Sequence, residues 1–296
     1  MLRLGILRSP HGHSLSEVMQ NAALQYLNIN GEYKAYGVSE DELKNVFEKL
    51  KADGIKGLNV TIPHKIKVIK FLDELTDTAK LIGAVNTITF NNGKSIGDNT
   101  DVIGFWESIP EKIRKRNSNK TVAILGCGGA AHAVCTALIL NNAKSIKIYG
   151  RDRNKLESFK KHFLKTPRWG DSDVEIGLFD DIDLSDTSFL VNTTPIGMYP
   201  NINDMPIKKE QLKKLLVETS RRGVSTFVYD IIYNPPETKL LQDAKSLGLQ
   251  TLNGVEMLVR QGAASLNIWL EKEIAPVSVM RMAVLRSLGH DTIPLK

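Results

Sequence analysis

The sequence predicts an α/β protein of two domains, with a doubly wound parallel sheet in the second. Apolar, strand-like segments alternate along the chain with segments of helical periodicity, which is typical of strand–helix–strand units. A glycine-rich turn follows one fully apolar strand directly and opens a helix, as it does in doubly wound folds. The 296 residues are enough for two domains of ordinary size.

In the N-terminal part, periodicity, β-branched residues and turn signals predict the elements in turn. Strands are expected over residues 2–7, 33–38, 55–62 and 84–89. Helices are expected to begin at Ser14, to cover 41–52, to begin at His64 with helix-forming residues up to Leu81, and to begin near Val102. Asn91-Asn92-Gly93 is a strong turn signal.

The composition changes after Pro110, where a polar run through Asn119 indicates a hinge or linker. The strand over 121–125 is apolar throughout, which is typical of a parallel sheet covered on both faces. Further strands are expected over 145–149, 174–179, 188–193 and 226–232, and helices over 132–141, 239–247 and 253–269.

Composition and charge narrow the classes of protein. Apolar residues make up 42% of the chain, which argues against wholesale disorder. The net charge of +6 would suit an anionic ligand, but no nucleic-acid recognition motif accompanies the scattered lysines. With no signal pattern, no spanning run and only Cys127 and Cys135 as cysteines, we expect a cytoplasmic protein without disulfides or a metal site.

The segment 57–65 concentrates polar groups at one strand end. Asn59 and Thr61 share a face of the strand 55–62, and Pro63 ends it because proline cannot donate to a ladder. Lys65 then lies at the carboxyl tip of the strand, the edge at which open α/β sheets bind ligands. This amine is the predicted centre of the chemistry.

Three further positions allow a structural and a functional interpretation. Ser14 and Glu17 form a capping-box pattern, or Ser14 and Ser16 bind a carboxylate at the helix N-terminus. Asp101 ends a polar loop and either caps its helix or belongs to a site. Gln261 lies among apolar residues and either faces solvent or reaches a ligand.

The turn at 126–131 fits the G-x-G-x-x-G/A fingerprint of Rossmann-type dinucleotide-binding domains. Gly126 makes the tight turn, Gly128 lets the backbone approach a pyrophosphate, and Ala131 allows close helix–strand packing. At the end of the next strand, Arg151, Arg153 and Lys155 favour a 2′-phosphate and hence NADP. Asp152 favours NAD, unless its side chain points away.

Seven segments in the same order resemble the shikimate dehydrogenase family, which includes quinate/shikimate dehydrogenases. The resemblance covers almost the whole chain. It rests on His13-Ser-Leu-Ser16, Asn59-Val-Thr-Ile-Pro-His-Lys65, Ile82-Gly-Ala-Val-Asn-Thr-Ile88, Asn99-Thr-Asp101, Gly126-Cys-Gly-Gly-Ala-Ala131, Asn192-Thr-Thr-Pro-Ile-Gly-Met198 and Gln261.

The resemblance implies a role for each matched position. Lys65, paired with Asp101, would be the acid/base group, and Ser14 and Ser16 would hold the substrate carboxylate. The ring hydroxyls would be held by Asn59, Thr61, Asn86, Asp101 and Gln261, with Tyr233 flanking the substrate. The cofactor would contact Gly126, Cys127, Gly128, Gly129, Ala130, Ala131, Arg151, Asp152, Lys155, Thr193, Met198, Ile231 and Gly254.

The chain departs from the family pattern at a few places. Asp98 stands where tyrosine is usual, and Gly150 and Asp152 flank Arg151 where Asn-Arg-Thr is typical of NADP users. Glu256 replaces a glycine and adds a carboxylate near the expected nicotinamide end, unless it faces solvent at the helix start.

The resemblance implies NADPH-dependent, reversible reduction of 3-dehydroshikimate to shikimate in aromatic amino acid biosynthesis, by a monomer or homodimer. Two alternatives stay open: an NAD-linked quinate/shikimate dehydrogenase, and a non-catalytic sensor that binds nucleotide or shikimate. The last helices are expected to return to the first domain. The substrate domain would thus comprise 1–103 plus 256–296, and the NADP-binding domain 104–255.

Overall fold

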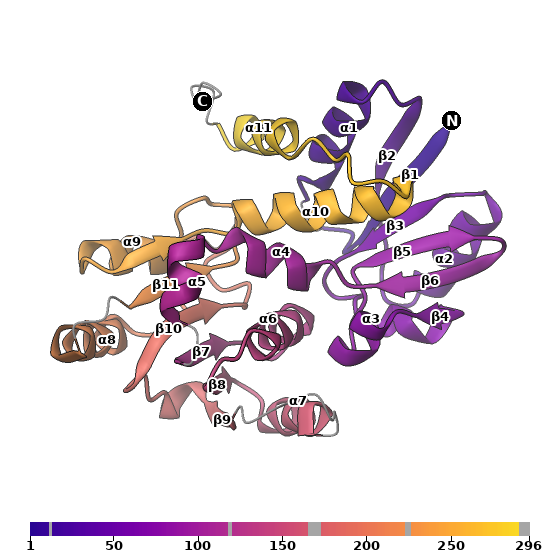
Figure 1. Ribbon diagram of the computed structural model, residues 1–296. Coiled ribbons are helices and arrows are strands. Elements are labelled where there is room, and N and C mark those ends of the chain that lie inside the picture. The colour runs from indigo at the N-terminus through magenta and orange to yellow at the C-terminus, as the bar shows by residue number, and fades with distance from the viewer. Residues whose placement is uncertain (12–13, 118–119, 165–172, 223–225, 290–296) are drawn as a thin grey trace. The chain divides into compact units, whose positions relative to one another are not determined.

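The computed structural model describes residues 1–11, 14–117, 120–164, 173–222 and 226–289 of the chain (Figure 1). It divides into two compact units. Unit 1 comprises Met1–Phe105 and Glu256–Lys296, and unit 2 comprises Trp106–Val255. The chain therefore leaves unit 1, completes unit 2 and then returns.

The sheet of unit 1 is mixed. Its strands in the described ranges have the order β2-β1-β3-β5-β6-β4. The β1, β2 and β3 strands run parallel, whereas β5 is antiparallel to both β3 and β6. The bounds are β1 Leu2–Arg8, β2 Gly31–Gly37, β3 Gly57–Val60, β4 Glu74–Leu75, β5 Thr87–Asn91 and β6 Lys94–Asp98.

The helices of unit 1 come from both ends of the chain. They are α1 Ser16–Tyr26, α2 Leu43–Ala52, the 3₁₀ helix η1 Lys67–Phe71, α3 Asp77–Ile82, α4 Asp101–Ser108, α10 Val255–Leu270 and α11 Val277–Ser287. The unit boundaries cut two of these helices: only the first five residues of α4 belong to unit 1, and α10 belongs to it from Glu256 onward. Apolar residues of α2, η1 and α3, including Phe47, Val68 and Ala79, form one core with Leu58 of β3. The helices α1 and α11 pack against each other.

Small residues let α10 approach its neighbours closely. A Cβ on Gly57 of β3 would lie 2.2 Å from Trp269 Nε1, which donates to the Ile88 carbonyl oxygen at 3.0 Å. A Cβ on Gly104 of α4 would lie 2.6 Å from Gln261 Cβ. The α10 helix is therefore seated directly on β3 and α4, where the polar groups of unit 1 gather.

The sheet of unit 2 is parallel throughout the described strands, in the order β12-β11-β10-β7-β8-β9. The strand bounds are β7 Thr121–Leu125, β8 Ser145–Gly150, β9 Asp173–Leu178, β10 Thr187–Asn192, β11 Phe227–Asp230 and β12 Gln250–Leu252. The helices are α5 Glu111–Asn117, α6 Gly129–Leu140, α7 Arg153–Leu164, the 3₁₀ helix η2 Phe179–Asp181, α8 Lys209–Arg222 and α9 Lys239–Ser246.

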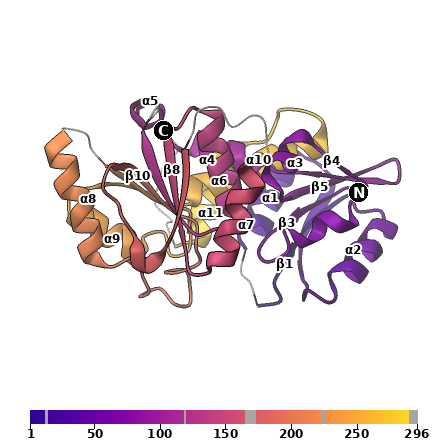
Figure 2. The same cartoon turned by 90° about the horizontal axis from the view of Figure 1, so that it is seen from below.

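Both faces of this parallel sheet are covered. Figure 2 shows α6 and α7 on one side of the strands and α8 and α9 on the other. Leu212 of α8 and Leu240 of α9 pack with Leu125 of β7 and Leu190 of β10 in one buried core. The doubly wound arrangement predicted from the alternating segments is confirmed.

Several local predictions differ from the structure for physical reasons. The run after Pro110 was expected to be a linker, but 111–117 form α5, which begins directly after the proline as helices often do. The strand expected over 84–89 is β5, which starts at Thr87, because the Val85 and Asn86 N–H groups donate to Lys65 and Asp98 outside the ladder. The hairpin strand β6, paired with β5 across Asn92-Gly93, was missed.

The helix expected from His64 is a short 3₁₀ turn, η1, that starts only at Lys67. The Lys65 carbonyl oxygen accepts a hydrogen bond from Val85 N at 2.8 Å instead of from a residue of the next helical turn. Within the described part of the chain, no helix is both long and apolar enough to cross a membrane.

Candidate active site

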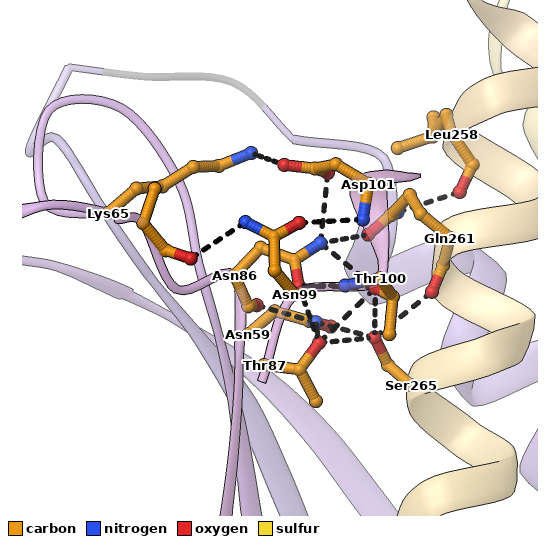
Figure 3. Close-up of polar contacts among 11 residues, drawn as sticks. Asn59, Lys65, Asn86, Thr87, Asn99, Thr100, Asp101, Leu258, Gln261 and Ser265 are labelled. Atoms are coloured by element: carbon orange, nitrogen blue, oxygen red, sulfur yellow. Dashed lines mark hydrogen bonds and ion pairs between the residues drawn. The ribbon is translucent and has the colours of Figure 1, made fainter. Parts of the chain in front are cut away.

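Lys65 and Asp101 form a short ion pair inside unit 1 that is almost closed off from solvent. Lys65 Nζ donates to Asp101 Oδ2 at 2.5 Å (Figure 3). The Lys65 side chain is only 15% exposed and the Asp101 side chain only 5% exposed. A charged pair so little exposed is stable only when further hydrogen bonds hold it. Those bonds come from the neighbouring segments.

Lys65 is placed by the loop after β3. Its carbonyl oxygen accepts from Val85 N, and the preceding residue, His64, is fully buried with its ring Nε2 2.9 Å from the Val38 carbonyl oxygen. Because a carbonyl can only accept, this ring nitrogen carries the proton. The loop is thus tied to the ends of two other segments, which fixes where the lysine stem begins.

Asp101 is the first residue of α4, and its carboxylate does not cap that helix. Asn99 Oδ1 accepts from the Asp101 N–H at 2.9 Å, while Asp101 Oδ1 accepts from Asn86 Nδ2 at 2.9 Å. Both carboxylate oxygens are therefore used by site residues, Asn86 on one side and Lys65 on the other. Of the two interpretations of Asp101, the geometry favours the site.

Gln261 of α10 reaches the same cluster. Its Oε1 lies 3.3 Å from Asn86 Nδ2, and its Nε2 donates to the Leu258 carbonyl oxygen at 2.7 Å. The side chain is half-buried and directed to the cluster drawn in Figure 3. The alternative of a glutamine that simply faces solvent is therefore not what the structure shows.

Asn59 lies deeper than expected for a ligand contact. It is 4% exposed, and its Nδ2 donates to the Asn86 carbonyl oxygen and to Ser265 Oγ, each at 3.0 Å. Its Oδ1 accepts from the Tyr33 hydroxyl at 2.8 Å. The polar atoms of Asn59 are thus engaged within the cluster, whereas Thr61 lies half-buried just beyond β3.

Four residues that the sequence did not single out complete this cluster: Tyr33, Thr87, Thr100 and Ser265. All four are at most 3% exposed. Thr87 and Thr100 lie inside motifs that were already recognised, and Ser265 follows Gln261 by one helical turn. The spacing of four along α10 was the available signal for Ser265.

Ser14 and Ser16 come together at the start of α1, but the capping box was wrong. The helix begins at Ser16, two residues later than predicted, and the Ser14 hydroxyl oxygen accepts from Ser16 N at 3.2 Å. The Ser14 hydroxyl also donates to Ser16 Oγ at 3.0 Å. Two hydroxyls thus stand side by side at a helix N-terminus, a location that favours anions. His13 of the same motif lies outside the described residues.

The hydroxyl of Tyr33 lies near Ser16 and belongs to the cluster. Burial raises the pKa of Tyr33 well above its usual value, and Ser16 partly opposes that shift. Tyr33 donates to Asn59 Oδ1, and Asn59 Nδ2 donates to Thr87. Thr87 and Asn86 continue these hydrogen bonds to Asp101.

In unit 2, the glycine-rich turn joins β7 to α6. Gly126 has φ +107°, which favours glycine, and a Cβ there would lie 2.6 Å from Thr193 Oγ1. Gly128 caps α6, and the space that its Cβ would fill is open. Gly129, Ala130 and Ala131 form the first turn of α6, whose N–H groups have no partner within the helix.

At the end of β8, the three polar residues differ in what they contact. Asp152 Oδ1 accepts from Lys155 N at 3.1 Å, so its carboxylate caps α7. Arg151 is exposed and makes no ion pair within the described residues, and the Lys155 side chain is exposed as well. Cys127 is half-buried near Lys155 and Asp152, and burial raises the pKa of its thiol.

The loops after β10 and β11 are fixed by a buried pair. Asn192 Nδ2 donates to Asp230 Oδ1 at 3.1 Å, and Asp230 Oδ2 accepts from the Thr238 hydroxyl at 2.7 Å. Burial raises the pKa of Asp230 to about 6. Ile231 follows directly, and its carbonyl oxygen leaves room only for a glycine at Gly254.

The other expected cofactor and substrate residues of unit 2 lie on these loops. Thr193 donates its hydroxyl to the Leu125 carbonyl oxygen at 2.7 Å, which holds β10 to β7. Met198 is 42% exposed, and Tyr233 is half-buried after β11. Thr193 therefore packs against the turn at Gly126, and the side chain of Met198 is exposed to solvent.

Glu256 is not a solvent-facing residue. It accepts from Arg281 Nε and Nη2, both at 2.7 Å, and from Arg260 Nε at 2.8 Å. Burial opposes its ionised form, but Arg281 and Arg260 together lower the pKa of Glu256 below its ordinary value. This carboxylate joins α10 to α11 inside unit 1.

Comparison with known proteins identifies the family. The "Shikimate dehydrogenase substrate binding domain" family matches residues 6–88, and the "Shikimate 5'-dehydrogenase C-terminal domain" family matches residues 254–285. The NADP(+) shikimate dehydrogenase of Methanocaldococcus jannaschii is 42% identical over 285 residues, 95% of each chain. The chain belongs to the shikimate dehydrogenase family.

Solved shikimate dehydrogenase structures share the whole fold. One in complex with NADP⁺ is 40% identical, with a TM-score of 0.85 over 97% of this chain and 96% of that one. The Listeria monocytogenes enzyme, in complex with shikimate and NAD, is 30% identical, with a TM-score of 0.79 over 95% of each chain. A 5-ketofructose reductase of Gluconobacter is 32% identical, with a TM-score of 0.79 over 97% of this chain and 98% of that one.

Proposed function

We propose that this protein is an NADP-dependent shikimate dehydrogenase, which reversibly reduces 3-dehydroshikimate to shikimate in aromatic amino acid biosynthesis. The observation that carries the proposal is the Lys65–Asp101 pair, held at 2.5 Å in a buried hydrogen-bonded cluster of a shikimate dehydrogenase chain. A protein that only bound its ligands would not need an acid/base pair so firmly arranged.

Lys65 moves the proton in this reaction. In the direction of reduction, its ammonium group donates a proton to the C3 carbonyl oxygen, so an O–H bond forms as the C=O double bond becomes single. In the direction of oxidation, the neutral amine takes the same proton back. Asp101 fixes the direction of Nζ through the 2.5 Å contact, and positioning of this kind supplies much of the rate in two-substrate reactions.

Ser14 and Ser16 are proposed to hold the substrate carboxylate. Their hydroxyls lie 3.0 Å apart at the N-terminus of α1, an eleven-residue helix whose dipole favours an anion. Asn86, Gln261 and Thr61 are proposed to hold the ring hydroxyls, with Asn59 behind them. We assign Asn59 a supporting part because its polar atoms already have partners in the protein.

The residues of unit 2 fit a dinucleotide. Gly126 and Gly128 leave the space that a backbone-bound pyrophosphate needs, and α6 offers its first-turn N–H groups. When bound, NADP(H) supplies or accepts the hydride. Arg151 and Lys155 would hold the 2′-phosphate, and Thr193, Met198, Ile231 and Gly254 would surround the ribose and nicotinamide.

Asp152 need not select NAD. Its carboxylate accepts from Lys155 N and thereby serves α7 rather than a ribose. This supports NADP as the main cofactor, although a relative binds NAD. We accordingly propose NADP, with NAD as the weaker cofactor.

The test is a set of initial rates, followed by the absorbance of reduced nicotinamide, with shikimate or quinate and with NADP or NAD. Shikimate with NADP is expected to be fastest. Faster turnover with quinate and NAD would replace the proposal by the dual-specificity alternative. Shikimate binding by calorimetry without turnover in any of the four mixtures would support the sensor.

A third substrate tests the carboxylate site. We expect 5-ketofructose, which has no carboxylate, to be reduced poorly, and Ser14→Ala to raise the KM for shikimate while leaving any rate with 5-ketofructose unchanged. Size-exclusion chromatography with light scattering distinguishes monomer from homodimer. We propose a cytoplasmic location because both cysteines are free thiols.

A further inference from the structure

The direction of the Asn86 side-chain amide is fixed by its surroundings. Its Oδ1 lies 2.8 Å from the Thr100 backbone N–H, which can only donate, and accepts from the Thr87 hydroxyl at 2.8 Å. Its Nδ2 must therefore face the other way. There it donates to Asp101 Oδ1 and to Thr100 Oγ1, each at 2.9 Å (Figure 3).

The hydroxyls of Thr87 and Thr100 both lie beside Ser265 of α10. Ser265 Oγ is 2.8 Å from Thr87 Oγ1 and 3.1 Å from Thr100 Oγ1. Its own proton is donated to the Gln261 carbonyl oxygen at 3.0 Å, one turn earlier in α10. Towards the two threonines, Ser265 therefore presents lone pairs only.

Two arrangements of the threonine protons fit these distances: the Thr100 hydroxyl donates to Ser265 and the Thr87 hydroxyl to Asn86 Oδ1, or the two hydroxyls exchange these acceptors. In both arrangements Asn59 Nδ2 donates to Ser265 and Asn86 donates to Asp101. Thr87 and Ser265 are fully buried, and Asn86 and Thr100 are at most 3% exposed. Water cannot replace a missing partner there, so each bond constrains the next.

We propose that Ser265 is a positioning residue for the reaction: by accepting from one of the two threonine hydroxyls it leaves Asn86 Oδ1 to the other, and so holds the Asn86 amide that fixes the Asp101 carboxylate against Lys65. Ser265 has no contact with Lys65 or Asp101 and acts only through these neighbours. The inference rests on the proposed function, because it assigns Lys65 and Asp101 the proton transfer.

Removing the Ser265 hydroxyl changes the proton arrangement. In Ser265→Ala, one threonine hydroxyl loses its acceptor and turns to Asn86 Oδ1, which lies 2.8 Å from the Thr87 hydroxyl and 3.2 Å from the Thr100 hydroxyl. The Thr87 and Thr100 hydroxyls then compete for one carbonyl oxygen, and Asn86 no longer holds Asp101 in one orientation. Loss of alignment at the reacting atoms affects turnover more than substrate binding.

The experiment compares steady-state constants of the full-length protein and its variants with shikimate and NADP. We expect Ser265→Ala to lower kcat about tenfold and to change the KM for shikimate by less than about threefold. Ser265→Thr, which keeps the hydroxyl, should recover kcat to within about threefold of the unchanged protein. The matched control is Ser95→Ala, since Ser95 is also fully buried in unit 1 but bonds Asp73.

A double-mutant cycle shows whether Ser265 acts through Asn86. In an Asn86→Ala background, Ser265→Ala should leave kcat unchanged, because the amide that it orients is gone. Additive losses would overturn the proposal, as would equal losses of kcat in Ser265→Ala and Ser95→Ala. If Ser265→Ala is not recovered folded, Ser265→Cys takes its place, with the same expectation.

The same measurements separate this inference from the proposed function. If the wild-type protein has no activity towards shikimate, the proposed function itself is contradicted. An active protein whose Ser265→Ala variant keeps its full kcat contradicts only the role of Ser265.

Discussion

Lys65 Nζ lies 2.5 Å from Asp101 Oδ2, while the other oxygen of the same carboxylate is held by Asn86. We predict that Lys65→Ala lowers kcat by about 10²–10⁴-fold, the usual contribution of a general acid/base group. The dissociation constant for shikimate should change little, because the proposed carboxylate site at Ser14 and Ser16 lies elsewhere in unit 1. Stopped-flow rates and calorimetry measure the two quantities.

Lys67→Ala is the matched control for this variant. Lys67 lies two residues further along, is 47% exposed and pairs with Glu40 at the surface. Its removal should leave kcat unchanged. A Lys65→Ala protein with a near-normal rate would take Lys65 out of the mechanism.

A second prediction concerns the choice of cofactor. Arg151→Ala should raise the KM for NADP about 10- to 100-fold, since a charge-assisted contact to phosphate is lost, and should leave the KM for NAD almost unchanged. Arg153→Ala is the control, because Arg153 pairs with Glu157 along α7. Equal effects of Arg151→Ala on both cofactors would show that Arg151 does not read the 2′-phosphate.

The buried carboxyl of Asp230 predicts a pH dependence of stability in unit 2. Burial raises its pKa from 3.8 to about 6, so between these values the folded protein binds more protons than the unfolded chain. The free energy of unfolding should therefore fall as the pH rises through this window. A difference of about two pKa units corresponds to about 3 kcal/mol.

Asp230→Asn measures this contribution, because an amide carries no charge at any pH. Thr238 can rotate its hydroxyl to accept from the amide, so the fold is preserved. Urea unfolding should show the variant gaining about 2–3 kcal/mol relative to the unchanged protein between pH 4.5 and 7.5. A difference that does not vary with pH would mean that Asp230 titrates normally.

A fourth prediction concerns the carboxylate that joins α10 to α11. The pKa of Glu256 is lower in the folded protein than in the unfolded chain. The contribution of Glu256 to stability is therefore complete above the pKa that this carboxyl has in the unfolded chain. It is lost as the pH falls through the lower pKa that the carboxyl has in the folded protein. Glu256→Gln should cost about 1–2 kcal/mol at pH 7, because hydrogen bonds to charged groups are the stronger ones. Calorimetry should show a melting temperature lower by about 2–6 °C, and the difference should narrow below pH 4.

Glu271→Gln provides the comparison for Glu256→Gln. Glu271 is 73% exposed and lies 3.5 Å from Lys56, and surface pairs of this kind contribute little. If both variants lower the melting temperature equally, the contacts of Glu256 with Arg281 and Arg260 stabilise the protein no more than a surface ion pair does.

Local patterns were enough to predict the elements that depend on neighbours in the chain. The turn from Gly126 to α6 was predicted correctly, because strand, glycine spacing and helix are adjacent in sequence. The capping box was not, since the Ser14-x-x-Glu17 pattern is present but the Ser14 hydroxyl accepts from Ser16 instead. The polar segment of α5 could not be told from a linker, because both are rich in charged residues.

Side chains that meet through tertiary structure were the harder part. Lys65 and Asp101 were paired only through the family resemblance. Ser265 was missed because α10 contacts Asn59 and Thr87 from a position about 200 residues later, brought close by the small residues Gly57 and Gly104. No pattern within either segment reports that approach.

The return of the chain to unit 1 has a consequence for synthesis on the ribosome. Residues 1–105 emerge first, but Gln261 and Ser265 follow only after all of unit 2, Trp106–Val255, has been made. At ~5–20 residues per second, the delay is on the order of ten seconds. During that time the nascent first unit carries Asn59, Thr87 and Thr100 without their partner on α10. The unit that begins first is therefore the one that is completed last, and Asn86 and Asn59 gain their contacts with Gln261 and Ser265 only after α10 has been made.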